Sequence, residues 1–212
     1  MNFKAIIFDM DGVLFDTERF YYQRRELFLN DRGISIKHLP PSFFIGGNMK
    51  QVWRHILRKD YDKWDVDQLQ KDYTAYKDKH PLPYSSLIFD DTVSVIKTLD
   101  KAGVLLGLAS SSTKSDILRA LDSVGIRSYF KVILSGEEFV ESKPNPAIYE
   151  VAARQMGCSK ETILVVEDSE KGIAAGVAAG LTTWAVKDER FGMNQSQAAG
   201  FINCLSDLLS KD

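Results

Sequence analysis

The sequence predicts an α/β fold: a parallel sheet with helices on both faces, together with an inserted all-α helical domain. Residues 3–8 form an apolar strand pattern, and from residue 104 onward short apolar runs alternate with helical patterns. Such alternation is typical of a parallel sheet that helices cover on both sides. Residues 18–80 are charged and aromatic, follow helical patterns and contain no convincing β-branched run. We therefore expect this stretch to be an insertion rather than part of the sheet.

Composition places the chain among ordinary globular proteins. Its 212 residues and 23.9 kDa are enough to bury a full core in one or two domains. Hydrophobic residues make up 44% of the sequence, charged residues make up 26%, and the formal net charge is -2. This small net charge argues against a nucleic-acid-binding or membrane-binding surface.

No targeting or membrane-spanning segment is visible in the sequence. No apolar run approaches the ~18–20 residues of a membrane span, and the first residues enter a strand rather than a signal peptide. Cys158 and Cys204 have no metal-ligand spacing around them, which predicts free thiols in a reducing compartment. We therefore expect a cytoplasmic protein.

The alternating part of the chain begins with a strand at residues 104–109 and a helix at residues 115–124. Thr113 and Asp116 resemble a capping box at the start of this helix, and Gly125 is placed to end it. Proline favours the first helical position, so Asn145-Pro146 predicts the start of another helix. The remaining expected elements are strands at 132–134, 163–166 and 182–186, and helices at 92–102, from 146 to Gly157, and at 171–179.

The insertion is expected to contain several helices. The first has Phe20, Arg24, Leu27 and Phe28 on one face, and further helices are expected at 49–59 and 66–79. Trp53, Trp64 and the tyrosines of the insertion are expected to form its core, and Pro81 and Pro83 mark its end. We predict a core domain of residues 1–16 and 83–212 and a cap domain of residues 17–82, with hinges at the two crossings.

Reactive polar groups follow several of the predicted strands. Asp9 and Asp11 follow the first strand, Ser110 follows the second, and Glu167 and Asp168 follow a later one. In open α/β sheets, ligands bind beyond the carboxyl ends of the strands, where the strand order switches direction. The sequence therefore predicts one site that brings these side chains together. Lys143 stands alone before the helix that starts at Asn145-Pro146, and we expect it to join them.

These residue types fit phosphoryl transfer. A carboxylate such as Asp9 can attack phosphorus and form an acyl phosphate, and Asp11 can act as acid and base. Phosphate needs hydroxyl and N–H donors, which Ser110 and Ser111 offer, and a cation, which Lys143 offers. Crowded acids also need a hard cation, so we expect Mg²⁺ with Asp9 and Asp168 as carboxylate ligands.

The motif Asp9-Met-Asp11-Gly12-Val-Leu-Phe-Asp-Thr17 resembles the first motif of the haloacid dehalogenase superfamily of phosphatases. The later stretches 109–111, 142–146 and 166–169 with Gly172 resemble its other three motifs, in the same order across essentially the whole chain. The resemblance implies a Rossmann-like core with a small helical cap. Implied roles are Asp9 as nucleophile, Asp11 as acid and base, Ser110 and Lys143 holding phosphate, and Mg²⁺ held by Asp9, the Asp11 carbonyl and Asp168 with help from Glu167. Gly12, Thr17 and Ser111 complete the expected phosphate-binding residues.

Within that superfamily the chain is most similar to the β-phosphoglucomutase-like branch, but its cap differs. Phe20, Tyr21 and Tyr22 stand where a mutase has a histidine near its acid and base, and Ile45 and Met49 stand where the mutase cap loop has a lysine and an arginine. We therefore expect a phosphatase for a small sugar phosphate or similar metabolite. A mutase stays the alternative, because Lys50 can substitute for the missing arginine.

Two non-enzymatic alternatives are a phospho-accepting receiver domain and a silent binding protein with the same fold. The position of Asp9, the chain length and the presence of every motif residue argue against both. Ser112 is expected only to start a helix, Asp16 and Thr17 to shape the hinge and cap the first inserted helix, and the three histidines (His38, His55 and His80) to lie on the surface. We expect a monomer.

Overall fold

The computed structural model describes residues 3–46 and 49–210. Its centre is a six-stranded sheet in the order β3-β2-β1-β4-β5-β6, and every adjacent pair is parallel. The direction of strand order switches between β1 and β4, so the crevice of the sheet lies at the carboxyl ends of these two strands. The strands are β1 (Ala5–Phe8), β2 (Leu105–Ser110), β3 (Phe130–Ser135), β4 (Ile163–Glu167), β5 (Thr182–Val186) and β6 (Gly200–Ile202).

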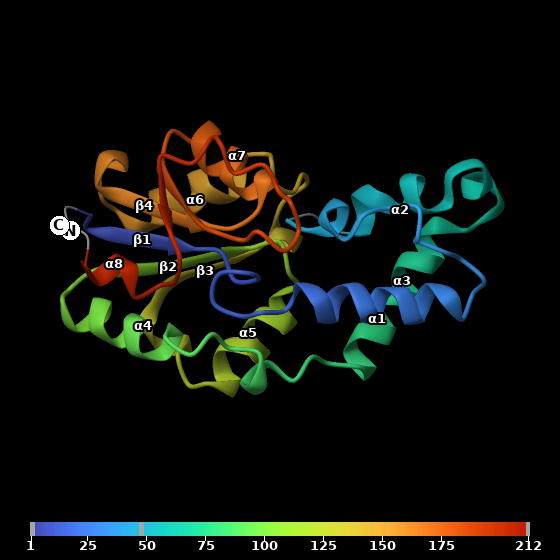
Figure 1. The fold of residues 1–212 in the computed structure, drawn as a ribbon, viewed down its shortest axis with the longest axis horizontal. Coiled ribbons are helices and arrows are strands. Elements are labelled where there is room, and N and C mark those ends of the chain that lie inside the picture. The colour runs from blue at the N-terminus through green and yellow to red at the C-terminus, as the bar shows by residue number, and fades with distance from the viewer. Residues whose placement is uncertain (1–2, 47–48, 211–212) are drawn as a thin grey trace.

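Helices cover both faces of the sheet, as Figure 1 shows. Helices α4 (Thr92–Lys101), α5 (Lys114–Ser123) and the short α8 (Asp207–Ser210) pack on the face that presents Ile6 and Phe8 of β1. Helices α6 (Ala147–Met156) and α7 (Glu170–Ala178) pack on the face that presents Ala5 and Ile7. Because successive strand side chains point to opposite faces, the short buried run of β1 contributes to both hydrophobic clusters.

The predicted α/β fold class is confirmed, with small differences in element bounds. Thr113 accepts a hydrogen bond from the Asp116 N–H at the start of α5, as the capping pattern predicts. Gly157 follows α6 in the left-handed region, with φ of 76°. Sequence patterns did not predict β6 or α8, because their three and four residues are too short to show a period.

The inserted segment is helical and has its own hydrophobic cluster. It contains α1 (Glu18–Asn30), α2 (Met49–Leu57) and α3 (Val66–Lys79), together with 3₁₀ turns at Pro41–Phe44 and Arg58–Lys63. Trp53 and Tyr73 are buried in this cluster, and Trp64 packs against it. The four residues predicted to share one face of α1 differ in burial: Arg24 and Phe28 are buried, whereas Phe20 and Leu27 are exposed. The helix turns Leu29 inward instead, because the apolar residues of α1 do not form a single stripe.

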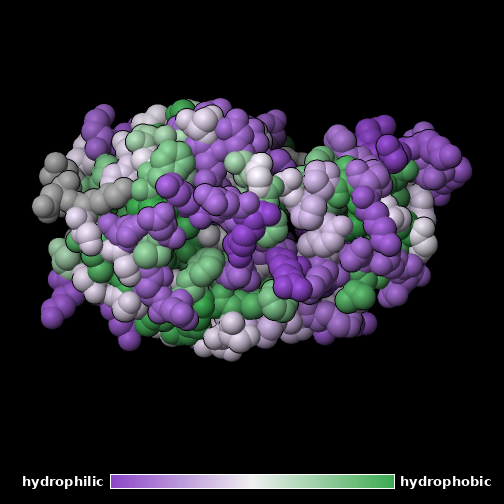
Figure 2. Space-filling model, in the orientation of Figure 1, coloured by the Kyte–Doolittle hydropathy of each residue, from purple (hydrophilic) through white to green (hydrophobic). Residues whose placement is uncertain are grey.

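The cap touches the core along several contacts around the end of the sheet. The Ser111 hydroxyl donates to the Gly46 carbonyl at 3.2 Å, and the Lys171 ammonium donates to the Phe43 carbonyl at 3.1 Å. Figure 1 shows the cap helices beyond the end of the sheet, and Figure 2 shows a notch between the two bodies at the upper edge. We propose that the chain divides into the two domains at residues 16/17 and 82/83.

The state of the cysteines and the apolar character of the helices bear on the kind of protein that the sequence predicts. Both cysteines are free thiols, as predicted. Across residues 3–46 and 49–210, no helix has the length and apolar character that a membrane crossing requires.

Candidate active site

Asp9 stands directly after β1, at the centre of the sheet. Its N–H donates to the Val166 carbonyl at 2.9 Å, so the pairing of β1 with β4 continues through this residue. The chain then turns at Gly12, whose φ of 80° belongs to the left-handed region that glycine tolerates. A side chain at Gly12 would also overlap the Asp168 carboxylate. Residue 12 must therefore lack a Cβ for the loop after β1 to pass this close to the Asp168 carboxylate.

Lys143 lies at the centre of the buried charge cluster. Its ammonium donates to Asp9 Oδ1 at 2.5 Å, to Glu167 Oε1 at 2.7 Å and to the Tyr149 hydroxyl at 2.9 Å. A fourth contact, to the Ala109 carbonyl, measures 2.9 Å. Although burial alone would lower the pKa of Lys143, Asp9 and Glu167 raise it above its usual value, so this lysine carries a positive charge.

Glu167 ends β4 and is fully satisfied by hydrogen bonds. Oε1 accepts from Lys143 and from the Tyr149 hydroxyl, while Oε2 accepts from the Asp168 and Ser169 N–H groups and the Ser169 hydroxyl. Burial would raise the pKa of Glu167, but the charge and hydrogen bond of Lys143 hold it below its usual range. Gly172 in α7 leaves the space that this carboxylate occupies. Glu167 is therefore an ionised group that orients Lys143.

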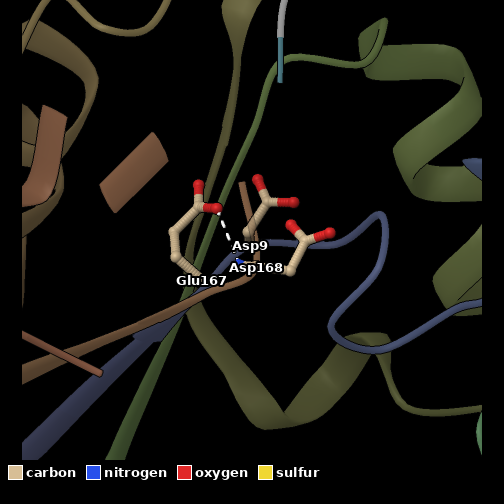
Figure 3. A group of neighbouring side chains, drawn as sticks. All are labelled: Asp9, Glu167 and Asp168. Atoms are coloured by element: carbon tan, nitrogen blue, oxygen red, sulfur yellow. Dashed lines mark hydrogen bonds between the residues drawn. The ribbon is translucent and has the colours of Figure 1, made fainter. Parts of the chain in front are cut away.

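Asp9, Glu167 and Asp168 form a buried acidic cluster, which Figure 3 shows at the ends of β1 and β4. Each offers one carboxylate oxygen within 4.8 Å of the others, and Asp168 Oδ2 is buried without a hydrogen-bond partner among the described residues. Burial raises the pKa of Asp9 to about 8 despite Lys143. Burial and the charges of Glu167 and Asp9 raise the pKa of Asp168 well above its usual value. A divalent cation fits this set, because it would satisfy Asp168 Oδ2 and favour the ionised carboxylates.

Hydroxyl groups hold the Asp11 carboxylate. Thr17 donates to Oδ1 at 2.6 Å, and Ser112 donates to Oδ2 at 2.7 Å. Ser110 lies 3.4 Å from Oδ2, and its oxygen accepts the Ser112 N–H at 3.0 Å. Burial raises the pKa of Asp11, while the hydrogen bonds from Thr17 and Ser112 oppose that rise. Asp11 thus stands in a polar, fixed position, in which a proton can be taken up or given.

A cavity of about 720 Å³ opens from these residues toward the cap. Asp9, Asp11 and Asp168 lie at its base, and α1 and α3 form its far wall. Ser111 lines it while bonding to the cap loop at Gly46. This volume suits a small metabolite.

The structure brings the predicted strand-end residues together but also shows three that the sequence analysis missed. Ser112 was expected only to start a helix, yet it donates to Asp11. Thr17 precedes α1 without a side-chain capping bond and instead donates to Asp11, while Asp16 pairs with Arg190 at 2.9 Å. Tyr149 and Ser169 were missed because nothing in a helical pattern indicates which hydroxyl reaches a buried carboxylate. The three histidines lie outside the cavity lining.

Comparisons with known proteins identify the family. A family model for haloacid dehalogenase-like hydrolases matches residues 6–186. The chain belongs to this family. Pyrophosphatase PpaX of Listeria monocytogenes serotype 4a (strain HCC23) is 26% identical over 216 residues, which cover 97% of this chain and 94% of that protein. Phosphoglycolate phosphatase of Aquifex aeolicus (strain VF5) is 25% identical over 182 residues, which cover 85% of this chain and 83% of that protein.

Two solved structures have the same fold as this chain. β-Phosphoglucomutase from Clostridium difficile has a TM-score of 0.83 at 21% identity, covering 97% of this chain and 93% of that chain. A haloacid dehalogenase-like hydrolase from Bacteroides fragilis has a TM-score of 0.81 at 21% identity, covering 97% and 99%. The family model makes this protein a hydrolase, as predicted, and the two curated relatives that match it are named as phosphatases.

Proposed function

We propose that the protein is a Mg²⁺-dependent phosphomonoester hydrolase that acts on a small sugar phosphate or similar metabolite through an aspartyl-phosphate. One observation supports this proposal most directly. The buried Asp9 carboxylate accepts a hydrogen bond from Lys143 at 2.5 Å, while the nearby Asp11 carboxylate accepts hydrogen bonds from the Thr17 and Ser112 hydroxyls. A nucleophile and a separate acid two residues apart are what phosphoryl transfer in two steps requires. The activities named for the two curated relatives support phosphate release as the outcome.

The residues divide the reaction between them. Lys143 orients Asp9 and attracts the phosphate, so that the Asp9 carboxylate can attack phosphorus. Asp11 protonates the leaving oxygen, and it later takes the proton from the water that splits the aspartyl-phosphate. Ser110, Ser111 and Gly12 are the proposed contacts of the phosphate oxygens, and Thr17 keeps Asp11 in place.

Asp9, Asp168 and the Asp11 carbonyl would hold Mg²⁺, with Glu167 fixing the neighbouring charges. Bound there, the ion supplies positive charge that screens the phosphate oxygens from the carboxylates. Without that charge, the raised pKa of Asp9 leaves much of this carboxyl protonated near neutral pH. Metal binding and nucleophile ionisation are therefore expected to be linked.

The mutase alternative turns on the cap loop. Ile45 is buried and apolar where a mutase has a lysine, and this disfavours a grip on a second phosphate at that position. The side chains of Met49 and Lys50 lie outside the described residues. A phosphatase therefore remains the proposed function, and the experiment below includes the mutase reaction.

The direct experiment measures phosphate release from a panel of sugar phosphates and small phosphomonoesters with Mg²⁺. Conversion of β-glucose 1-phosphate to glucose 6-phosphate is followed in the same assay, and Asp9→Asn protein serves as the blank. We expect free phosphate from one or several substrates and none from the variant. Isomerisation with little phosphate release would establish the mutase, and release by the Asp9→Asn protein at the wild-type rate would refute the nucleophile.

A further inference from the structure

Among the described residues, Arg24 and Lys77 are two of the four cap cations that line the cavity, together with Arg25 and Lys71. Arg24 comes from α1 and Lys77 from α3, and both line the same cavity as Asp9 and Asp11. Arg24 is 6% exposed, and the Lys77 side chain is 15% exposed. The mechanism proposed above uses neither residue. Buried cations away from the reacting atoms need an explanation, because removing a charge from water is costly unless an anion compensates it.

Arg24 is incompletely paired within the described chain. Its Nη1 donates to the His80 carbonyl at 3.0 Å, and its guanidinium lies 5.2 Å from the centre of the Tyr21 ring. Its Nε is buried and has no hydrogen-bond partner among the described residues. A guanidinium binds best when its adjacent N–H groups face a carboxylate or phosphate together, so an unused Nε points to a missing anion.

Lys77 is also weakly paired. Its ammonium lies 4.0 Å from Asp116 Oδ2, too far for a hydrogen bond. That carboxylate already accepts from the Thr113 hydroxyl at 2.9 Å and from Arg119 at 3.2 Å. Burial, reinforced by the nearby charge of Arg24, lowers the pKa of Lys77 even though Asp116 opposes this shift. The charges of Glu137 and Asp78 oppose it as well, so the lowering comes chiefly from burial. Among the described residues, no carboxylate lies within hydrogen-bond distance of the Lys77 ammonium.

Tyr21 lies between Arg24 and the residues around Asp11. Its ring contacts Arg24, and its hydroxyl lies 3.2 Å from the Ser112 hydroxyl, which donates to Asp11. One tyrosine side chain and one serine hydroxyl thus separate the acid Asp11 from Arg24.

We propose that Arg24 and Lys77 form a second anion-binding position, and that the preferred substrate carries a carboxylate or a second phosphate besides the phosphate that is cleaved. This inference rests on the proposed function, because it names the substrate class of that same site. The position differs from the cap loop, where Ile45 offers no charge. Arg24 of α1 and Lys77 of α3 thus make the cap select diacids, from the wall of the cavity opposite the sheet.

The test compares three substrates that differ at the distal group. Glycerol 3-phosphate has a neutral hydroxyl there, 3-phosphoglycerate has a carboxylate, and glycerol 1,3-bisphosphate has a phosphate. Values of kcat/KM are measured for wild-type protein and for Lys77→Met. The matched control is Lys79→Met, because Lys79 lies exposed on the same helix and outside the cavity lining.

We expect the wild-type protein to prefer at least one diacid over glycerol 3-phosphate by about tenfold or more, the value of one charge-assisted hydrogen bond. Lys77→Met should reduce this ratio by about tenfold, and Lys79→Met should leave it unchanged. Preference for only one diacid would support the position and show whether it binds a carboxylate or a phosphate. A ratio near one in the wild type, or an equal loss on all three substrates in Lys77→Met, would overturn the proposal, since the latter marks Lys77 as a contact that closes the cap.

A binding measurement separates failure of this inference from failure of the proposed function. Asp9→Asn protein, with and without Lys77→Met, is titrated with the three compounds in a calorimeter. Diacid binding that depends on Lys77, in a protein whose wild type releases no phosphate, would support the anion position and refute the phosphatase. Turnover without any dependence on Lys77, or no diacid binding at all, would overturn the anion position.

Discussion

Three hydroxyl groups from two parts of the chain surround Asp11, and they set what this carboxyl group can do. Thr17 comes from the start of the cap, while Ser110 and Ser112 follow β2. Tyr21 of the cap helix supports Ser112 at 3.2 Å. The position of the acid thus depends on both the core and the cap.

Ser112 offers the sharpest test of this arrangement. Replacing it with alanine removes a 2.7 Å hydrogen bond to Asp11, so we expect Ser112→Ala to lower kcat by about tenfold with a smaller change in KM. Ser112→Thr keeps the hydroxyl and should restore most of the rate. Ser115→Ala is the control, because Ser115 is exposed one turn away. Steady-state kinetics that show equal rates for Ser112→Ala and Ser115→Ala would contradict the role.

The raised pKa of Glu18 predicts that the stability of the protein depends on pH. This half-buried residue lines the cavity, and burial with the charge of Asp11 raises its pKa from 4.5 to about 8. The folded state therefore binds a proton that the unfolded state has lost, and the free energy of unfolding falls as pH rises from 4.5 to about 8.

Glu18→Gln cannot ionise, so its free energy of unfolding should not show this fall between pH 4.5 and about 8. At about pH 8 the variant should be more stable than the wild type by about 1 kcal/mol, allowing for partial exposure, and at about pH 4 the two should agree. Urea unfolding at the two pH values measures the difference. A difference that does not depend on pH would show that Glu18 is not held protonated.

At the residue scale, the sequence predicts the groups that follow strands, because chain order and sheet topology together bring them to one edge. It does not predict Ser112 or Tyr149. Their roles depend on rotamers and helix rotation, which place one hydroxyl on Asp11 and another on Glu167. A pattern of polar residues carries no information about such angles.

Among the elements, α7 packs closely against the catalytic strand β4 through a glycine. A Cβ at Gly172 would overlap the Glu167 carboxylate, which itself orients Lys143. We expect Gly172→Ala to destabilise the protein by about 1–3 kcal/mol and to lower activity as well. Thermal unfolding and steady-state kinetics measure both effects.

Val177→Ala provides the matched control on the same helix, because Val177 is exposed. Its effect on unfolding should stay within about 0.5 kcal/mol. If Gly172→Ala left both stability and rate unchanged, the close approach of α7 to Glu167 would not matter for the site.

The strands and helices of the core were predictable because their apolar periods and glycine ends are strong. The insertion was predictable as helical, and the bounds of α3 agree with those expected. The orientation of α1 was not predictable, since Arg24 and Arg25 are buried while Phe20 and Leu27 face outward. Charges that line a cavity reverse the usual rule that polar residues lie outside, and a single helix pattern does not reveal the cavity.

For the whole molecule, we predict that the acidic cluster makes stability depend on a bound metal ion. Mg²⁺ that binds the folded state alone should stabilise it by about 2.7 kcal/mol at 100 times its Kd, which thermal unfolding detects as a rise in Tm. Asp168→Asn should abolish most of this rise, because Asp168 Oδ2 is buried without a hydrogen-bond partner among the described residues. Asp90→Asn, which changes an exposed acid, is the control. The same Mg²⁺-dependent rise in Asp168→Asn would place the metal elsewhere.

The central claim is that Asp9 becomes phosphorylated during turnover, and acid quench followed by peptide mass spectrometry tests it most directly. The protein is mixed with Mg²⁺ and its best substrate, quenched within the first turnovers and digested. We predict that the peptide containing Asp9 gains the mass of one phosphoryl group, and that this gain disappears in Asp9→Asn protein together with phosphate release. Steady phosphate release without that modified peptide, retained by the Asp9→Asn protein, would contradict the account.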